Sequence, residues 1–131
     1  MKVPPPVADL IGIERRSFGD GKCTMEMEVE ERHSNPMGTV HGGILCDLAD
    51  AAMGMAYFST LADGESFTTL ELKINFLRPF WQGKLAANGR VVSRGRTVGL
   101  AECDVVDEHG RLIARATSTC MTLRGDAASG R

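Results

Sequence analysis

The sequence predicts an α+β fold in which a curved antiparallel sheet of about six strands wraps one long central helix. The first observation is the segment 43–60, which is apolar on nearly all sides and has no wide polar face. A helix of this kind is buried on most sides. The second observation is a set of about six strand-like segments separated by turn residues. One helix and six strands can cover each other's apolar faces only if the sheet curves around the helix.

The chain begins with a lead-in and a hairpin. Residues 4–6 are three prolines, which favour an extended backbone, and a short helical turn is expected near 7–12. A first strand near 11–17 is followed by the turn Gly-Asp-Gly at 19–21. Residues 22–30 then alternate strictly between apolar and polar side chains, which is typical of a half-buried strand. The two strands are therefore expected to pair through the turn.

Four further strands are expected after the helix at 43–60. In the first of them, alternate residues are apolar and should share one face, namely Leu70, Leu72, Ile74 and Phe76. Residues typical of turns separate the remaining strands at 83–93, 98–106 and 111–123.

Composition restricts the class of protein. The 131 residues fit one domain, 1–131, with 1–9 as the lead-in and 125–131 as a frayed tail. The chain is 43% hydrophobic and 24% charged, and its net charge of −2 with mixed signs argues against a nucleic-acid or membrane surface. The start of the chain has no apolar core of the kind a signal peptide needs. A cytoplasmic protein is therefore expected.

The cysteines do not indicate a metal site or a disulfide framework. The four are scattered, without a C-x-x-C pair or a nearby histidine, at Cys23, Cys46, Cys103 and Cys120. This pattern favours free thiols in a reducing compartment and predicts no bound metal. Cys46 is a poor candidate nucleophile, because the helix around it is apolar and no histidine lies in a usable arrangement.

The segment from Asn35 to Asp50 is the most informative about function. His41 is followed by Gly42 and Gly43 where a loop must turn into the helix. The first turn of a helix leaves its N–H donors without internal partners, so it attracts negative charge, including charge that develops on an oxygen during a reaction. Nine residues after His41, Asp50 places a carboxylate among apolar residues. Burying an ionised group there is energetically unfavourable unless it has a partner or a functional role. These two features together indicate a hydrolase for activated acyl groups.

This segment also resembles a known family. The block N-P-x-G-x-x-H-G-G-x-x-x-x-L-A-D, from Asn35 to Asp50, is similar to the signature of the hotdog-fold acyl-CoA thioesterases, in the PaaI-like branch of phenylacetic acid degradation. The similarity continues through Asn75-Phe76-Leu77-Arg78-Pro79 and covers roughly residues 10–123. It implies hydrolysis of an aryl-acetyl, aromatic or short- to medium-chain acyl-CoA to a free acid and coenzyme A. It implies no cofactor apart from the coenzyme A of the substrate.

The resemblance also assigns roles to five residues. Asp50 would act as a general base on water or as a nucleophile that forms a mixed anhydride, and both routes remain open. The Gly42 N–H would polarise the thioester carbonyl. Asn35 would lie near the reacting carbonyl or form a turn, and Thr69 would hold the attacking water or serve only as a strand residue. His41 would orient the loop or help to hold the carbonyl. Asp47, one turn before Asp50, is expected to reach solvent.

Other residues are candidates for substrate binding. Gly43 is a candidate for contact with the substrate, and Met53, Tyr57 and Phe58 would line the acyl pocket. Seven methionines suggest that this pocket is adaptable. Arg94 and Arg96 flank Gly95 in a turn that relatives use for the nucleotide end of coenzyme A, and guanidinium groups suit phosphate. The alternative for both arginines is an exposed turn residue without a ligand.

Two other functions remain as alternatives. Enoyl-thioester hydratases and dehydratases of the same fold need a histidine paired with an acidic residue in a different loop context. A non-catalytic binding module for acyl-CoA or acyl-carrier protein has no reason to place an unpaired acid at Asp50.

The helix also predicts self-association. It is apolar nearly all round, whereas a six-stranded sheet covers one side, so the uncovered side needs a partner. A homodimer or a dimer-of-dimers homotetramer is expected. The resemblance implies that Gly42 and Asn35 of one chain face Asp50 and Thr69 of its neighbour.

Overall fold

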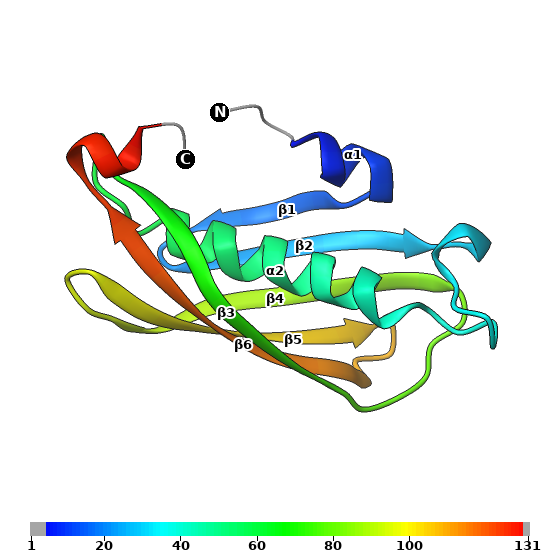
Figure 1. The fold of residues 1–131 in the computed structure, drawn as a ribbon. Coiled ribbons are helices and arrows are strands. Elements are labelled where there is room, and N and C mark those ends of the chain that lie inside the picture. Colours follow the sequence, from blue (N-terminus) through cyan, green and yellow to red (C-terminus); the bar gives the residue numbers. More distant parts are fainter. Residues whose placement is uncertain (1–4, 130–131) are drawn as a thin grey trace.

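The computed structural model, which describes residues 5–129, consists of one long helix packed on a six-stranded antiparallel sheet (Figure 1). The central helix α2 spans Gly42–Phe58. The strands are β1 (Glu14–Gly19), β2 (Lys22–Val29), β3 (Ser66–Phe76), β4 (Gly83–Arg94), β5 (Val98–Asp107) and β6 (Leu112–Leu123). Their order in the sheet is β1-β2-β4-β5-β6-β3. The predicted fold class is therefore confirmed.

The sheet twists as it passes around α2. In Figure 1, β3 and β6 run steeply across the direction of β1 and β2, while α2 lies on the concave side. Gly89 on β4 marks the closest approach, because a Cβ there would lie 2.6 Å from the carbonyl carbon and oxygen of Ala52. Glycine at this position lets the helix backbone rest directly on the sheet.

The core lies between the sheet and one side of α2. The helix contributes the buried residues Leu45, Leu48, Ala49, Ala52, Met53, Gly54, Ala56 and Tyr57. Its other side carries the exposed residues Gly43, Asp47 and Asp50, with half-buried neighbours between them. We call this side the open face of α2. The sheet therefore covers only part of the helix, as the sequence predicted.

The expected alternation along β3 is wrong at Leu70. Thr69 pairs with Cys120 and Glu71 with Thr119, so Leu70 is an extra residue with no partner on β6. This bulge changes the residues that face the helix, and Leu72 packs against the core while Leu70 is 52% exposed. Leu70 is therefore an exposed residue of the bulge and not part of the core.

Several boundaries also differ from the prediction. α2 ends at Phe58, because the hydroxyls of Ser59 and Thr60 donate hydrogen bonds to the carbonyls of Ala56 and Tyr57, both at 2.7 Å. β1 begins at Glu14, and β3 begins at Ser66.

The short elements lie outside the sheet. The expected helical turn is α1 (Pro6–Ile11), which follows an extended Pro5. A 3-10 helix, η1 (Glu31–His33), precedes the loop into α2, and a second, η2 (Gly125–Ala128), replaces part of the expected frayed tail. The remaining ends of the lead-in and tail, 1–4 and 130–131, lie outside the described residues. In the described part of the chain, no helix is long and apolar enough to cross a membrane.

Candidate active site

A buried histidine holds the loop that leads into α2. The His33 ring is 3% exposed. Its Nδ1 accepts a hydrogen bond from the Glu30 N–H at 3.0 Å, and its Nε2 donates one to the Ile11 carbonyl at 2.8 Å. The His33 carbonyl in turn accepts the His41 N–H at 2.8 Å. Sequence reasoning missed His33, because nothing in a lone histidine outside the motif indicates that both ring nitrogens are used.

His41 caps the first turn of α2. Its Nδ1 accepts a hydrogen bond from the Gly43 N–H at 2.9 Å. The proton of the neutral ring is therefore on Nε2. This geometry supports the orienting role that the sequence allowed for His41, and it occupies the Gly43 N–H.

The Gly42 N–H is left free by this arrangement. As the first residue of α2, Gly42 has no carbonyl within the helix to donate to, and its N–H has no acceptor among residues 5–129. A Cβ at Gly42 would lie 2.7 Å from Cζ of Phe76, so a larger residue would have to displace this ring. A free donor at a helix N-terminus can receive an oxygen on which negative charge develops.

A pocket of about 330 Å³ opens at Gly42. We call it the Gly42 pocket, and it is lined by Asn35, Thr39, Val40, Gly42, Leu45, Phe76, Leu77, Arg78, Pro79 and Phe80. Of the predicted site residues, Asn35 and Gly42 therefore lie at one pocket.

The Asn35 side chain organises its own loop. Its Oδ1 accepts hydrogen bonds from the Met37 N–H at 2.9 Å and the Thr39 N–H at 3.2 Å, and its Nδ2 donates to Oγ1 of Thr39 at 2.7 Å. The turn-forming role is thus the one that its hydrogen bonds support. Asn35 shapes the wall of the Gly42 pocket by holding this turn.

Asp50 lies on the open face of α2. Its side chain makes no hydrogen bond or ion pair within the described part of the chain, and the residue is exposed. Desolvation nevertheless raises the pKa of Asp50, and repulsion from Asp47 adds to the rise. Such a shift moves a carboxyl group toward the range of a general base.

Thr69 lies next to the buried thiol of Cys120. Its Oγ1 is 4.0 Å from Sγ of Cys120, which in turn lies 3.9 Å from Oγ of Ser118. Burial raises the pKa of Cys120, contacts with Ser118 and Thr69 oppose the rise, and the charge of Asp50 adds to it. Cys120 thus contacts Thr69 and is influenced by the charge of Asp50. The Leu70 bulge follows directly and shapes this end of β3.

The predicted catalytic residues therefore fall into two clusters within one chain. His41, Gly42 and Asn35 form the first, and Asp50 and Thr69 form the second. Gly42 and Asp50 are eight residues apart on α2, which corresponds to about 12 Å along the helix axis. Within one chain the two groups cannot act on the same carbonyl.

Two residues expected in the acyl pocket belong to the core instead. Met53 and Tyr57 are fully buried and do not line the Gly42 pocket. The hydroxyl of Tyr57 lies 2.7 Å from Oγ1 of Thr122, and its ring packs against Phe67. A helix that is apolar all round does not reveal from its sequence which residues face the sheet.

Arg94 and Arg96 differ in their environment. The Nε of Arg94 donates to Oγ1 of Thr60 at 2.9 Å, and its guanidinium lies 4.8 Å above the Tyr57 ring. Its Nη1 also donates to the Gly95 carbonyl. Arg94 thus braces the turn between β4 and β5. Arg96 is exposed, and its side chain has no partner among the described residues.

The thiol of Cys46 is not activated. Burial raises its pKa, and the charges of Asp47 and Asp50 raise it further, so the thiolate is disfavoured. Within residues 5–129, no group of three or more His, Cys, Asp or Glu side chains could hold a metal ion.

Fold and site together define a class of protein, a hotdog-fold hydrolase with a free N–H at the start of its central helix. Residues 37–114 match the model of the thioesterase superfamily, and the chain belongs to this family. It is 31% identical to human acyl-coenzyme A thioesterase 13 over 105 residues, 79% of this chain and 74% of the relative.

Solved structures agree with this assignment. The PaaI protein from the phenylacetic acid degradation operon of E. coli superimposes with a TM-score of 0.87 at 27% identity, over 94% of this chain and 88% of that protein. A thioesterase from Haemophilus influenzae gives a TM-score of 0.87 at 26% identity, over 92% and 85%. The chain is therefore a PaaI-like thioester hydrolase.

Proposed function

We propose that this thioesterase hydrolyses acyl-CoA thioesters to a free acid and coenzyme A, with each active site formed by two chains. The observation that carries the proposal is the Gly42 N–H, which opens on a pocket and has no acceptor within the described chain. Aryl-acetyl, aromatic and short- to medium-chain acyl groups are the proposed substrates. The names of the relatives, acyl-coenzyme A thioesterase 13 and a protein of the phenylacetic acid degradation operon, support this range.

The separation of Gly42 from Asp50 supports a site shared between chains. Asp50 is exposed on the open face of α2, and β3 pairs only with β6, so its other edge is free in the described chain. A two-fold dimer could cover both surfaces at once. In such a dimer the Gly42 pocket of one chain faces Asp50 and Thr69 of the other, and vice versa.

The proposed reaction uses these groups in sequence. The Gly42 N–H donates a hydrogen bond to the thioester oxygen and stabilises the charge that develops there, with help from the helix dipole. Asp50 removes a proton from a water molecule held by Thr69, and the resulting hydroxide attacks the carbonyl carbon. The C–S bond then breaks, and the departing sulfur receives the proton. In the alternative route, Asp50 attacks the carbon directly, the C–S bond breaks and the thiolate of coenzyme A leaves. Water then cleaves the mixed anhydride to the free acid and the Asp50 carboxylate, and the proton that it releases goes to the thiolate.

A dimer of dimers is the proposed assembly. Val98 and Leu100 on β5 are 46% and 39% exposed, and they alternate with buried residues, so they face away from α2. A second dimer packed on this apolar surface would cover both side chains. The reaction needs no cofactor beyond coenzyme A and water, and we propose that it takes place in the cytoplasm.

The direct test is hydrolysis measured with a thiol reagent. Phenylacetyl-, benzoyl- and straight-chain acyl-CoA esters should release coenzyme A at rates that differ by acyl group. The mass of the second product should be that of the free acid. Absence of hydrolysis across the panel would overturn the proposal.

A further inference from the structure

His33 lies outside the Gly42 pocket, yet it is bonded to the residue that precedes Gly42. It is the only buried one of the three histidines, all of which are in the described part of the chain. A buried polar ring destabilises the fold unless its nitrogens have partners, whereas an apolar side chain would fill the same space without this requirement. Packing alone therefore does not explain a histidine at this position.

The ring of His33 closes the 3-10 turn before the loop. η1 has a capping box, in which the Glu30 side chain accepts the His33 N–H and Nδ1 of His33 accepts the Glu30 N–H. Glutamate or glutamine usually has the second of these roles. Histidine differs from glutamate because its Nε2 remains a donor, and here it bonds the Ile11 carbonyl. The turn is thus fixed both to the residue after β2 and to the last residue of α1.

Arg32 adds to the link with α1. Its Nη1 donates to the Leu10 carbonyl at 2.8 Å, and its Nη2 donates to the Ile11 carbonyl at 3.3 Å. The last carbonyls of a helix lack partners within the helix, so they are available to such donors. Arg32 and His33 together connect η1 to the end of α1, which thus supports η1 from outside the sheet.

The backbone of His33 carries this support to the start of α2. Its carbonyl accepts the His41 N–H at 2.8 Å. The His41 carbonyl accepts the Ile44 N–H at 3.0 Å, and the His41 ring accepts the Gly43 N–H. The N–H of Gly42 belongs to the peptide group that contains the His41 carbonyl. Its direction therefore depends on a residue whose own N–H is held by His33.

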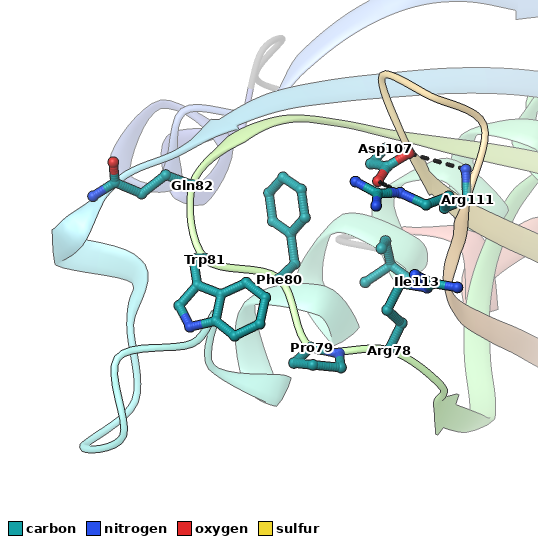
Figure 2. Close-up of a pocket in the computed structure, with 8 residues that line it drawn as sticks. All are labelled: Arg78, Pro79, Phe80, Trp81, Gln82, Asp107, Arg111 and Ile113. Carbon is teal, nitrogen blue, oxygen red and sulfur yellow. Dashed lines mark hydrogen bonds and ion pairs between the residues drawn. The ribbon is translucent and has the colours of Figure 1, made fainter.

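A second anchor of the same loop comes from the β3–β4 connection. The Val40 N–H donates to the Phe80 carbonyl at 2.7 Å. Figure 2 shows Phe80 in this connection, where it lines a cavity of about 330 Å³ with Trp81 and Ile113. Phe80 also lines the Gly42 pocket, so this anchor is part of the pocket wall. The His33 anchor instead ties the loop to α1 and β2, which do not line that pocket.

We propose that His33 is a positioning residue of the active site, which sets the direction of the Gly42 N–H by fixing His41 to α1 and to the end of β2. His33 does not contact the substrate and acts through His41. The inference rests on the proposed function, in which the Gly42 N–H receives the charge that develops on the thioester oxygen. Displacement of such a donor lowers the rate more than it weakens substrate binding, because this charge develops only in the transition state.

Two substitutions and a matched control test this role. His33→Leu removes both hydrogen bonds of the ring, whereas His33→Gln keeps one acceptor and one donor in the side chain. Ser59→Ala is the control, because the Ser59 hydroxyl also accepts one backbone N–H, from Gly21 at 2.8 Å, and donates to one carbonyl, that of Ala56. Ser59 follows the last residue of α2, at the opposite end of the helix from Gly42.

The first measurement is amide hydrogen exchange followed by NMR, which is independent of hydrolysis. In His33→Leu, protection of the His41 and Gly43 N–H groups should fall by about tenfold or more, because the loop opens more often. Ser59→Ala should leave both unchanged and lower the protection of the Gly21 N–H instead. His33→Gln should stay within about threefold of the wild type at His41. Unchanged protection of His41 in His33→Leu would overturn the inference.

The second measurement is steady-state hydrolysis of an acyl-CoA ester, well below the Tm of each variant. His33→Leu should lower kcat by about tenfold or more and change KM by less than about twofold. His33→Gln should restore kcat, and Ser59→Ala should leave it unchanged while lowering Tm. Equal losses of kcat in His33→Leu and Ser59→Ala would show that His33 contributes only to stability, and would overturn the inference.

These outcomes separate the inference from the proposed function. If the wild type cleaves acyl-CoA and His33→Leu keeps full kcat, the inference fails and the proposed function stands. If the wild type cleaves no ester while His33→Leu loses protection at His41, the proposed function fails and the link between His33 and His41 stands. Where His33→Leu does not fold, His33→Asn replaces it, because its shorter amide keeps an acceptor but cannot reach the Ile11 carbonyl. Full kcat in His33→Asn would likewise overturn the inference.

Discussion

The His41 imidazole and the Gly43 N–H form a hydrogen bond of 2.9 Å across the start of α2. The histidine thus accepts a hydrogen bond from one N–H of the first turn, that of Gly43, and leaves the neighbouring N–H of Gly42 without an acceptor. His41 could be taken for a general base from its place in the motif. The position of its ring nitrogen instead explains it as the cap of the helix.

This contact predicts different outcomes for two substitutions of His41. His41→Ala should lower stability by about 1 kcal/mol, the usual effect of losing an N-cap, and should lower kcat because the Gly42 loop loosens. His41→Asn should restore both, since asparagine is among the best N-cap residues. Urea unfolding and steady-state kinetics check this. Restored stability with activity still lost would instead assign a direct substrate contact to Nε2.

The second prediction concerns Asp50. Asp50→Asn should lower kcat by at least about a hundredfold, as expected for a base or nucleophile. The pKa of Asp50 is raised in the folded chain, so the ionised form destabilises the fold at neutral pH and the asparagine should not lower Tm. Asp47→Asn is the matched control, and it should retain most of the activity. An inactive Asp47→Asn beside an active Asp50→Asn would reverse the assignment.

The third prediction follows from the repulsion between Asp47 and Asp50. Because the pKa of Asp50 is raised, kcat/KM should be full above that pKa and fall as the pH drops through it. Asp47→Asn removes one raising charge, so it should move this acid limb to lower pH. Profiles of kcat/KM against pH for the two proteins check the direction. Superimposed acid limbs would show that Asp50 is not the titrating group.

The structural elements that could be predicted from sequence are those that depend on residues close together in the chain. The alternation over 22–30 and the motif from Asn35 to Asp50 depend on neighbours in the chain, and both predicted the elements that the structure contains. The Leu70 bulge depends on pairing with β6, about fifty residues later, which no local pattern reveals. The same holds for Tyr57, because an all-round apolar helix hides which side meets the sheet.

The candidate site shows the same limit. Gly42 and Asp50 could be identified as candidate site residues from their types and spacing. That they lie too far apart to act together within one chain is evident only once both are placed on the same helix, α2. Arg94 and Arg96 look equivalent in sequence, yet only Arg94 finds Thr60 and Tyr57 close by.

The fourth prediction tests the contact between α2 and β4. Gly89→Ala would place a Cβ 2.6 Å from the backbone of Ala52, which cannot move aside like a flexible side chain. We expect a loss of about 3 kcal/mol, at the upper end of overpacking effects. Gly54→Ala is the control, since its Cβ would meet only the end of the Phe67 ring, at 3.3 Å, and alanine favours the helix. Urea midpoints measure both. Equal stabilities for the two variants would contradict the close approach at Gly89.

The fifth prediction tests the shared site by mixing two inactive chains. Asp50→Asn removes the carboxylate, and Asn35→Ala removes the hydrogen bonds that hold the loop before Gly42. If each site takes one cluster from each chain, a mixed dimer has one site with both defects and one with neither. Random pairing makes half of the dimers mixed, so co-refolding equal amounts should restore about a quarter of the wild-type activity.

The mixing experiment needs two variants that are inactive on their own. Where Asn35→Ala retains activity, Gly42→Val replaces it, because its side chain would collide with the Phe76 ring and cover the free N–H. Differently tagged chains establish that mixed dimers form, and light scattering measures their mass. Recovery in these dimers requires that Gly42 of one chain act with Asp50 of the other, since the two residues of a single chain lie about 12 Å apart along α2. A monomeric protein would instead show that the reaction takes place within one chain, as would verified mixed dimers without activity. In that case either Asp50 or Gly42 would not be a catalytic residue.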